Sequence, residues 1–304
     1  MQSLEARITA GDDVNAGDIR GMSVLAIAAA AGKDAAVERL LAAGAAIDAR
    51  DSDGWTALGH ALRAGHAAAA SVLVRSGADV RRTQGKGTPP LLLAVGAKQA
   101  GLVAPLVAAG ARVDAADASG TTPLIAAAAA GDEDCVAALL AAGARSDPTD
   151  RRGRTALWLA ANNGAVASVR SLAGKSPLDA ADADGTTPLA AAAAKGFDGV
   201  VKTLLGAGAD ARIASHSGNL PLHVAAAAGQ AGTVALLATR SPEVDRVNQN
   251  RDTPLILAVK ARCAACAKTL LAAGASTRLR NSNSLTAADV ARRSGDARLI
   301  DLFK

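Results

Sequence analysis

The sequence predicts an all-α repeat solenoid, and three observations lead to that fold class. A leucine recurs along the chain at a nearly constant spacing, and a ladder of glycines marks the other end of each unit. The 304 residues are 50% hydrophobic, yet only two Trp, two Phe and no Tyr are present. Because a wide core normally recruits large aromatic rings, we expect a thin core of Ala, Leu and Val, which a stack of small units can bury.

The leucine ladder sets the length of the repeat. Its steps are 33 residues long, except for one step of 32, and its members are Leu25, Leu58, Leu91, Leu124, Leu157, Leu189, Leu222 and Leu255. The glycine ladder consists of Gly44, Gly77, Gly110, Gly143, Gly208 and Gly274, with Ser176 and Ser241 in the two missing positions. Such self-similarity is typical of repeat architectures. We therefore expect one continuous domain over 1–304, with full repeats at about 18–50, 51–83, 84–116, 117–149, 150–181, 182–214, 215–247 and 248–280.

The fourth repeat illustrates how a unit begins. Asp117–Gly120 has the composition of a turn, and the Thr122 hydroxyl can accept a hydrogen bond from an unpaired N–H as a helix N-cap. Pro123 fits the first helical position, where its missing N–H costs nothing. We expect a hairpin turn and then a first helix that runs to about Ala130 and is broken by Gly131.

The second half of the same repeat predicts another short helix, from about Glu133 to Ala141. Val136, Leu139 and Leu140 lie on one stripe at helical spacing, and Gly143 can adopt the left-handed conformation that closes a helix. Two such helices bury little surface alone, so their stability must come from stacking on neighbouring repeats.

Runs of alanine mark the first helix of several repeats, as in residues 190–194. Alanine has the highest intrinsic helix propensity, and its small side chain lets neighbouring helices approach closely. We expect this helix to be the inner one. Replacement of Ala192 by Leu should overpack the contact between repeats and cost roughly 1–3 kcal/mol.

Three strings carry a resemblance to a known family: "DASGTTPLI…AAAAAGD…LLAAGARSD", "DADGTTPLA…AAAAKGF…LLGAGADAR" and "RDTPLIL…LLAAGASTR". With them, the chain resembles ankyrin-repeat proteins over essentially its whole length. The resemblance implies a curved, elongated stack of units, each a hairpin tip followed by an antiparallel helix pair. It also implies a concave surface of hairpin tips and inner helices that binds other proteins, and a chain that is not an enzyme.

Two departures from the family pattern are informative. The family's His after Pro-Leu occurs only as His223, which faces Leu220 instead of Thr, so we expect apolar packing to replace the usual Thr and His network. Ser-Pro replaces Gly-Ala in "KSPLD" (175–179) and "RSPEVD" (240–245). Because proline disfavours helical geometry in the preceding residue, we expect these two helix ends to close differently, with a local change in the stack at 176–182.

Both ends of the chain are atypical. Residues 1–17 match the second half of a repeat at the 33-residue offset. We expect them to form an N-terminal half-repeat cap, or the chain to be cut from a longer parent. Residues 281–304 should form a C-terminal cap and a true terminus, with Arg292, Arg293 and Arg298 on a solvated face.

No cofactor, metal or catalytic constellation is predicted. Cys263 and Cys266 form C-x-x-C, but Cys266 falls on the same repeat position as Cys135, so we interpret both as small buried side chains. Three cysteines give no disulfide framework and fit a reducing compartment. The four histidines lie at unrelated repeat positions, and "GKGTPP" (85–90) lacks the phosphate-loop pattern and reads as a turn.

The net positive charge is weak support for a nucleic-acid partner. The chain has 33 Lys and Arg against 28 Asp and Glu, a net charge of +5, and basic residues gather at 79–87 and 149–155. Acidic tip residues interleave with them, and no aromatic array is available for stacking bases. We therefore expect a protein partner, possessing for example an acidic segment, with no membrane contact.

Variable positions on the tips and inner helices are the candidate partner contacts. They are Asp53, Trp55, Arg63, Lys86, Arg151, Arg152, Arg154, Asn162, Asn163, Asp184, Lys195 and His216. Trp55 is the sharpest candidate, because Trp is enriched among binding hot spots; packing on the neighbouring tip is the alternative. Trp158 holds the position of the family's His and is expected in the core.

The sequence thus favours a non-catalytic protein-binding module. The alternatives are an adaptor or targeting portion of a larger multidomain protein, and a binder of an anionic ligand or nucleic acid through arginine-rich tips. We expect a monomer in the cytoplasm, with export or delivery into a host cell as an alternative. The high Ala and Arg content suggests a bacterial source.

Overall fold

The computed structural model describes residues 13–240 and 243–304, and within them every regular element is a helix. Two isolated β-bridges, Gly17 with Ser23 and Gln84 with Thr88, occur in the loops, and the described residues form no strand. The chain divides into two compact units, Met1–Arg145 and Ser146–Lys304. The fold is the all-α repeat solenoid that the spacing of leucines and glycines predicts.

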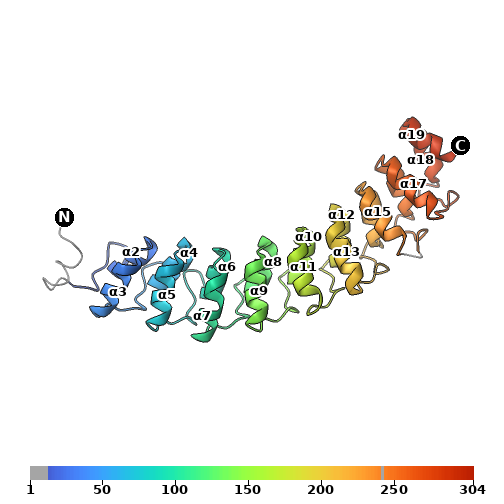
Figure 1. Ribbon diagram of the computed structural model, residues 1–304. Helices are drawn as coiled ribbons and strands as arrows, with labels where there is room; N and C mark the ends of the chain where they lie inside the picture. Colours follow the sequence, from blue (N-terminus) through green and yellow to red (C-terminus); the bar gives the residue numbers. More distant parts are fainter. Residues whose placement is uncertain (1–12, 241–242) are drawn as a thin grey trace. The chain divides into compact units, whose positions relative to one another are not determined.

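The first unit stacks four helix pairs (Figure 1). Their bounds are α2 (Val24–Ala30), α3 (Asp34–Ala42), α4 (Ala57–Ala64), α5 (Ala67–Arg75), α6 (Pro90–Gly96), the 3₁₀ turn η1 (Ala100–Leu102) with α7 (Val103–Ala108), α8 (Pro123–Ala130) and α9 (Glu133–Ala141). The first helices pack on one another in the order α2, α4, α6, α8, and the second helices in the order α3, α5, α7, α9. Each helix therefore contacts its own partner and the equivalent helices of adjacent repeats.

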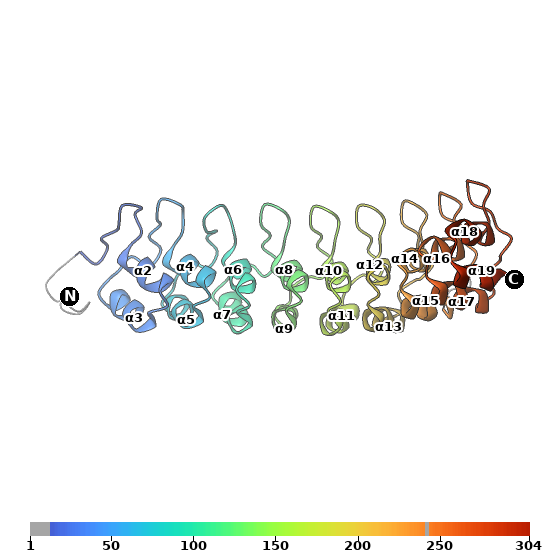
Figure 2. The ribbon, with the colours of Figure 1, turned by 90° about the horizontal axis from the view of Figure 1, so that it is seen from above.

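The second unit repeats this scheme and ends in a shortened pair. Its helices are α10 (Ala156–Asn162), α11 (Val166–Ala173), α12 (Pro188–Lys195), α13 (Asp198–Ala207), α14 (Pro221–Ala227), α15 (Ala231–Ala238), α16 (Pro254–Lys260), α17 (Ala264–Ala272), α18 (Ala287–Ser294), α19 (Ala297–Ile300) and the 3₁₀ turn η2 (Asp301–Phe303). In each unit, Figure 2 shows the loops that precede the first helices extending to the same side of the helix pairs.

The helix limits of the fourth repeat agree with those predicted from its sequence. The Thr122 hydroxyl accepts a hydrogen bond from the backbone N–H of Ile125 at 3.2 Å, and Pro123 is the first residue of α8. Gly131 ends α8 in the left-handed region at φ +64°, and Gly143 follows α9 at φ +84°. Local capping chemistry therefore determines where these helices begin and end.

Most of the hairpin tips that the structure describes are closed by one carboxylate or amide. In the second repeat, Asp51 Oδ1 accepts hydrogen bonds from the backbone N–H groups of Asp53 and Trp55 at 3.0 and 2.9 Å. Equivalent pairs of bonds end on Asp18, Asp117, Asp150, Asp182, Asn248 and Asn281. The tip thus satisfies its own backbone, as an Asx turn does.

The core is thin and made largely of alanine and leucine. Ala127 and Ala128 are fully buried in α8 of the first unit, and Leu189, Ala192 and Ala193 are fully buried in α12 of the second. Because Ala192 has no exposed surface, no space remains at that position for a longer side chain without displacement of a neighbouring helix.

Polar bonds also tie successive repeats together, 31 residues apart. The backbone N–H of Asp79 donates to Asp48 at 3.0 Å, and that of Ser276 donates to Asp245 at 2.8 Å. The same bond joins Asp210 to Asp179 at 3.1 Å, where Asp179 lies at the end of the repeat that is one residue short. The register between this repeat and the next is therefore kept.

The end of α11 closes differently from its counterparts, as the Ser-Pro substitution predicts. Gly143, at the equivalent position after α9, has φ +84°, whereas Ser176 after α11 is not among the residues with positive φ. The second Ser-Pro pair, at 241–242, lies outside the described residues, and α15 before it ends in Thr239 at φ −77°. Residues 1–12 of the expected N-terminal half-repeat also lie outside the described residues.

The expectation that apolar packing alone replaces the Thr and His network was wrong. Gln84 Oε1, from the next tip, accepts hydrogen bonds from the Thr56 backbone N–H and hydroxyl at 2.9 and 3.0 Å. Gly59 leaves the space that the Gln84 amide occupies. In the second unit, Trp158 Nε1 donates to the Thr186 carbonyl oxygen at 2.8 Å. In these two places, Gln84 and Trp158 therefore supply polar bonds between neighbouring repeats where the histidine is missing.

Candidate binding surface

Trp55 is held at the base of its tip in a defined orientation. Its side chain is half-buried and packs over Gly85 of the next tip, where an added Cβ would collide with the indole. The Arg63 guanidinium, from the last turn of α4, lies 4.5 Å from the centre of the indole ring. This stacking is a cation–π contact, and it brings together two of the residues predicted to bind a partner.

A buried hydrogen-bonded pair of side chains lies next to Trp55. His60 Nε2 lies 2.7 Å from Asp51 Oδ2, with both side chains only 7% exposed, and the His60 ring is centred 5.9 Å from the Trp55 ring. Burial raises the pKa of Asp51, but the hydrogen bonds from the Trp55 backbone and from His60 outweigh it and hold the pKa below its ordinary value. The tip that carries Trp55 is therefore rigidly connected to α4.

The remaining predicted contacts of the first unit lie on exposed tips. Asp53 is exposed and uses its backbone N–H to close its own turn, and Lys86 is exposed at the tip of the next repeat. A backbone bond of 3.2 Å, from Gly85 N–H to the Gly54 carbonyl, joins the two tips. We call Asp51, Trp55, His60 and Arg63, with the Gly85 backbone, the Trp55 cluster.

In the second unit, Arg154 and Trp158 are anchored structural residues. Trp158 is 8% exposed, which confirms its expected place in the core. Arg154 donates to Asp150 Oδ2 through Nε at 2.8 Å and through Nη2 at 2.6 Å, and its Cζ lies 5.6 Å from the centre of the Trp158 ring. Burial raises the pKa of Asp150, and the Arg154 bonds outweigh that effect and lower it. Most of the Arg154 charge is thus compensated within its own repeat.

Three consecutive tips of the second unit are linked into one row. The Ala183 N–H donates to the Arg152 carbonyl at 2.8 Å, and the His216 N–H donates to the Asp184 carbonyl at 3.0 Å. Arg152, Asp184 and His216 are exposed, as is Arg151 beside them. We call Arg151, Arg152, Asp184 and His216 the tip row.

The predicted contacts at the ends of the inner helices lie apart from these tips along their repeats. Asn162 is the last residue of α10, and its side-chain amide donates to Asn163 Oδ1 at 3.2 Å. Lys195 is exposed at the last position of α12. Asn162, Asn163 and Lys195 are exposed to different degrees, and they add polar surface at the C-terminal ends of the first helices.

Sequence reasoning missed the Asp51 and His60 pair. The two residues lie nine positions apart on a tip and a helix, a spacing that carries no recognised signal. The eighth repeat holds a similar pair that was also missed: Lys260 Nζ lies 2.6 Å from Asp252 Oδ2, and Asn281 donates to Asp252 Oδ1 at 3.0 Å. Both pairs depend on how a first helix folds back onto its own tip.

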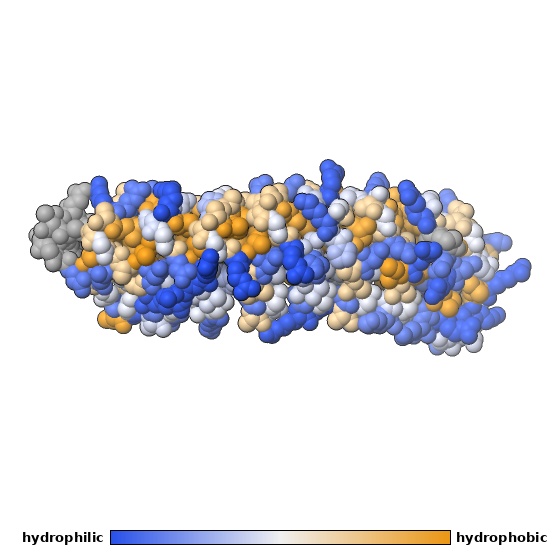
Figure 3. All heavy atoms as spheres, turned by 90° about the horizontal axis from the view of Figure 1, so that it is seen from below, coloured by the Kyte–Doolittle hydropathy of each residue, from blue (hydrophilic) through white to orange (hydrophobic). Residues whose placement is uncertain are grey.

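Hydrophobic and hydrophilic side chains lie beside one another on one face of the molecule. Figure 3 shows orange hydrophobic patches along the helices beside blue hydrophilic ones. The large apolar side chains with the greatest exposure among the described residues are Ile19, Ile27, Val247 and Leu279, and none belongs to the Trp55 cluster or the tip row. Within the described range no helix has the length and apolarity to cross a membrane, and no three His, Cys, Asp or Glu side chains are placed to hold a metal ion.

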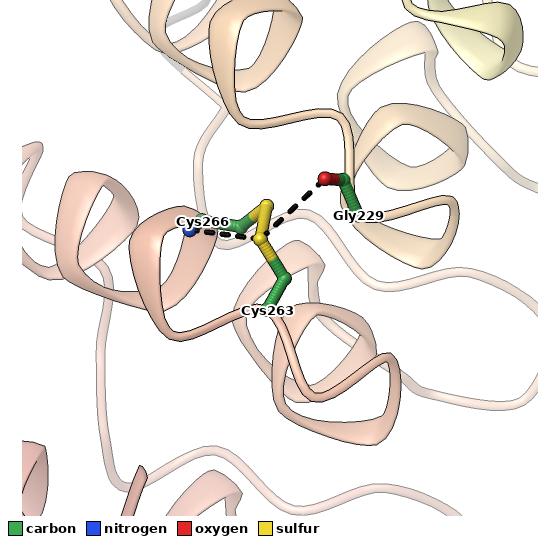
Figure 4. Close-up of a disulfide and its surroundings, with 3 residues drawn as sticks. All are labelled: Gly229, Cys263 and Cys266. Atoms are coloured by element: carbon green, nitrogen blue, oxygen red, sulfur yellow. Dashed lines mark hydrogen bonds between the residues drawn. A yellow bond between two sulfur atoms is a disulfide. The ribbon is translucent and has the colours of Figure 1, made fainter. Parts of the chain in front are cut away.

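The interpretation of Cys263 and Cys266 as two separate small side chains was wrong. A disulfide joins them, with their Cα atoms 5.2 Å apart (Figure 4). Cys263 is the N-cap of α17 and Cys266 lies in its first turn, so the helix itself brings the two sulfur atoms together. Cys266 is fully buried, as its repeat position predicts, and Cys135 is buried with a free thiol.

Comparison with known families finds one description along the chain, ankyrin repeats (3 copies), at residues 3–84, 76–151, 142–215 and 189–281. These overlapping matches extend from residue 3 to residue 281, which is far more than half of the chain. Comparison with curated proteins gives no match.

Proposed function

The chain belongs to the ankyrin-repeat family, and from that premise we propose that it binds a partner protein through its hairpin tips and inner helices. Ankyrin repeats are generally protein-interaction modules, and proteins built from them are typically non-catalytic. The finer proposal is that the Trp55 cluster is the principal contact in the first unit and that the tip row contributes in the second.

The observation that carries this proposal is that the Trp55 indole is both fixed in orientation and partly exposed. Its indole is fixed by Gly85, Arg63 and the buried Asp51 and His60 pair, yet it keeps part of its surface in solvent. A rigid aromatic side chain loses little conformational entropy when a partner covers it, and Trp and Arg are the residues most enriched in hot spots. The packing on Gly85 that the sequence offered as the alternative to binding is present. In this proposal the same packing also orients the ring for a partner.

The tip row supports contact with a polar or acidic segment. Arg151, Arg152 and His216 can donate hydrogen bonds, while the backbone bonds between tips keep their spacing fixed. Asp184 interrupts this basic set, so the row is suited to a mixed pattern of charges on the partner. Such complementarity gives specificity and a faster association rate.

Pairing of the arginines argues against general nucleic-acid binding. Arg154, Arg212, Arg292 and Arg298 each donate to a carboxylate two to four residues away in sequence. A neutralised guanidinium releases fewer counterions from a phosphate backbone, which is the main source of non-specific affinity. An adaptor role within a larger protein remains compatible with the same surfaces, because it also requires a bound partner.

The test is capture of a partner from lysate of the source organism by the full chain and two variants. We expect the wild type and Arg75→Ala to capture the same protein, because Arg75 is an exposed residue of α5 outside the Trp55 cluster. The double variant Trp55→Ala, Arg63→Ala should lose it. With that protein purified, Trp55→Ala alone should weaken binding by about 2 kcal/mol, or roughly 30-fold in Kd, in a titration.

Circular dichroism of each variant checks that its helices are retained. Equal capture by all three proteins would exclude the Trp55 cluster as the contact. Binding of arbitrary duplex DNA with an affinity that falls steeply with salt would instead favour the anionic-ligand alternative.

A further inference from the structure

The first turn of α17 holds a pair of cysteines in unlike surroundings (Figure 4). Cys263 is half-buried at the N-cap, whereas Cys266 has no exposed surface. Cys263 Sγ accepts a hydrogen bond from the Cys266 backbone N–H at 3.1 Å and lies 3.6 Å from the carbonyl oxygen of Gly229 in the preceding repeat. Part of Cys263 is therefore exposed to solvent, and no part of Cys266 is.

The disulfide contributes little to holding the fold together. It closes a loop within a single helical turn, and the stabilisation from a cross-link rises with the length of the loop it closes. The capping bond to Cys266 N–H needs only a sulfur acceptor at position 263, which a thiol also supplies. After reduction, the Cys263 S–H can donate to the Gly229 carbonyl, so both redox forms have partners within the same structure.

The fourth repeat provides a structural control for this site. There Asp132 is the N-cap and accepts from the Cys135 N–H at 3.1 Å, as Cys263 accepts from Cys266. Burial, and secondarily Asp132, raises the pKa of the Cys135 thiol to about 12, which makes it unreactive. The eighth repeat thus replaces a capping carboxylate by a second cysteine.

The charges around Cys263 differ from those around Cys135. The first turn of α9 carries Glu133 and Asp134, whereas the first turn of α17 carries no acidic residue. The N-terminal end of a helix favours negative charge, and Arg262 precedes Cys263 directly in the chain. A negatively charged sulfur is therefore better accommodated at Cys263 than at the buried cysteine of the fourth repeat.

We propose that Cys263 and Cys266 form a redox-active pair that exchanges with low-molecular-weight disulfides of the glutathione type. In oxidation, the Cys263 thiolate attacks one sulfur of glutathione disulfide, forming a mixed disulfide and releasing one glutathione thiolate. The Cys266 thiolate then attacks the Cys263 sulfur, forming the internal disulfide and releasing the second glutathione. The cysteine pair loses two electrons and two protons, and glutathione disulfide gains them; excess glutathione drives the reverse reaction through the same mixed disulfide.

The test uses the full chain with Cys135→Ala, so that only the pair contributes thiols. The protein is equilibrated in buffers of varied glutathione to glutathione disulfide ratio, quenched with acid, and alkylated with a maleimide that retards migration on a gel. We expect a single reversible conversion between forms with no alkylated thiol and with two. Two thiols that stay alkylatable at the highest disulfide ratio, or a disulfide that excess glutathione does not reduce, would overturn the proposal.

The assigned roles are tested by the order of reaction. In Cys266→Ser, Cys263 should form a glutathione adduct, seen by mass spectrometry, at least about tenfold faster than Cys266 does in Cys263→Ser. In the reduced Cys135→Ala protein, limiting iodoacetamide should modify Cys263 before Cys266, which checks the same order without disturbing the N-cap. Equal rates, or faster modification of Cys266, would refute the assignment.

Discussion

At the scale of single residues, glycine positions decide how polar side chains reach between repeats. Gly59 stands in α4 where the family has histidine, and the Gln84 amide fills the space beside it. An added methyl group would collide with that amide, and the amide is buried and bonded to Thr56, so it cannot turn away without losing two hydrogen bonds. We therefore expect substitutions of Gly59 and Gln84 to have coupled effects on the free energy of unfolding.

We therefore expect Gly59→Ala to lower the free energy of unfolding by about 1–3 kcal/mol, measured by urea denaturation, because of overpacking. In a Gln84→Ala background the same change should be neutral or stabilising, since alanine is the better helix former. Gly96→Ala is the matched control: Gly96 ends α6 with open space around it and should gain up to about 1 kcal/mol. Additive effects of Gly59→Ala and Gln84→Ala would contradict the contact.

The second prediction at this scale concerns pH. His223 is fully buried, its Nδ1 accepts from the Leu220 N–H at 3.2 Å, and burial lowers its pKa from the ordinary value near 6.5. Below that value the unfolded chain binds a proton that the folded chain does not, so stability must fall as pH falls. One proton corresponds to a slope of at most about 1.4 kcal/mol per pH unit.

We expect the free energy of unfolding to decrease between pH 7 and pH 5, and to decrease less steeply in His223→Asn, whose side-chain oxygen can keep the bond to Leu220. The comparison of the two slopes isolates His223 from His60, His66 and His216, which both proteins share. Identical slopes would show that the folded protein tolerates the imidazolium.

Sequence reasoning succeeded at this scale where a residue acts on its own backbone. Thr122, Gly131 and Gly143 perform the roles predicted for them, because capping depends on a few neighbouring residues. It failed for Gln84 and for the Cys263 disulfide. The first depends on the position of the next repeat, and the second on the exact first turn of a helix whose capping residue the sequence pattern did not identify.

At the scale of the helix, alanine content controls how closely the first helices approach. Ala192 is fully buried in α12, which packs between α10 and α14, whereas Ala194 on the same helix is half-buried. We expect Ala192→Leu to cost roughly 1–3 kcal/mol of stability, and Ala194→Leu to change it by less than about 0.5 kcal/mol. Thermal or urea unfolding followed by circular dichroism measures both. A similar cost for the two variants would mean that the burial of Ala192 does not limit packing.

Helix ends were predictable in kind but not in detail. The Ser-Pro substitution correctly indicated that α11 would end without a left-handed residue, yet the hydrogen bond between Asp179 and Asp210 shows that the next repeat is still in register. A proline restricts its immediate neighbour, whereas register depends on contacts 31 residues apart. Only the effect of the proline on its neighbour can be inferred from a short stretch of sequence.

At the scale of the whole molecule, stability should depend on the number of stacked repeats. Each unit buries its own layers of Ala and Leu, and the described helices make their main contacts with their partner and with the equivalent helices next to them. We expect fragments 1–145 and 146–304 each to be helical by circular dichroism and to unfold cooperatively, whereas the single repeat 182–214 should be unfolded. A folded single repeat would show that a helix pair needs no neighbour.

The sequence predicted the period and helix pairs because every repeat restates the same local signals. The binding positions were predictable only as a set of variable sites. Trp55 and Arg63 could be named separately, but their stacking, and the Asp51 and His60 pair beneath them, require the folded repeat.

The self-contained hairpin tips have an evolutionary consequence. Since one Asp or Asn satisfies the loop backbone in most repeats, the exposed side chains that directly follow that residue carry little duty in folding. After duplication of a repeat, mutations there can accumulate without loss of the stack. Copies of one ancestral unit can therefore diverge in what they recognise while they continue to share a single architecture.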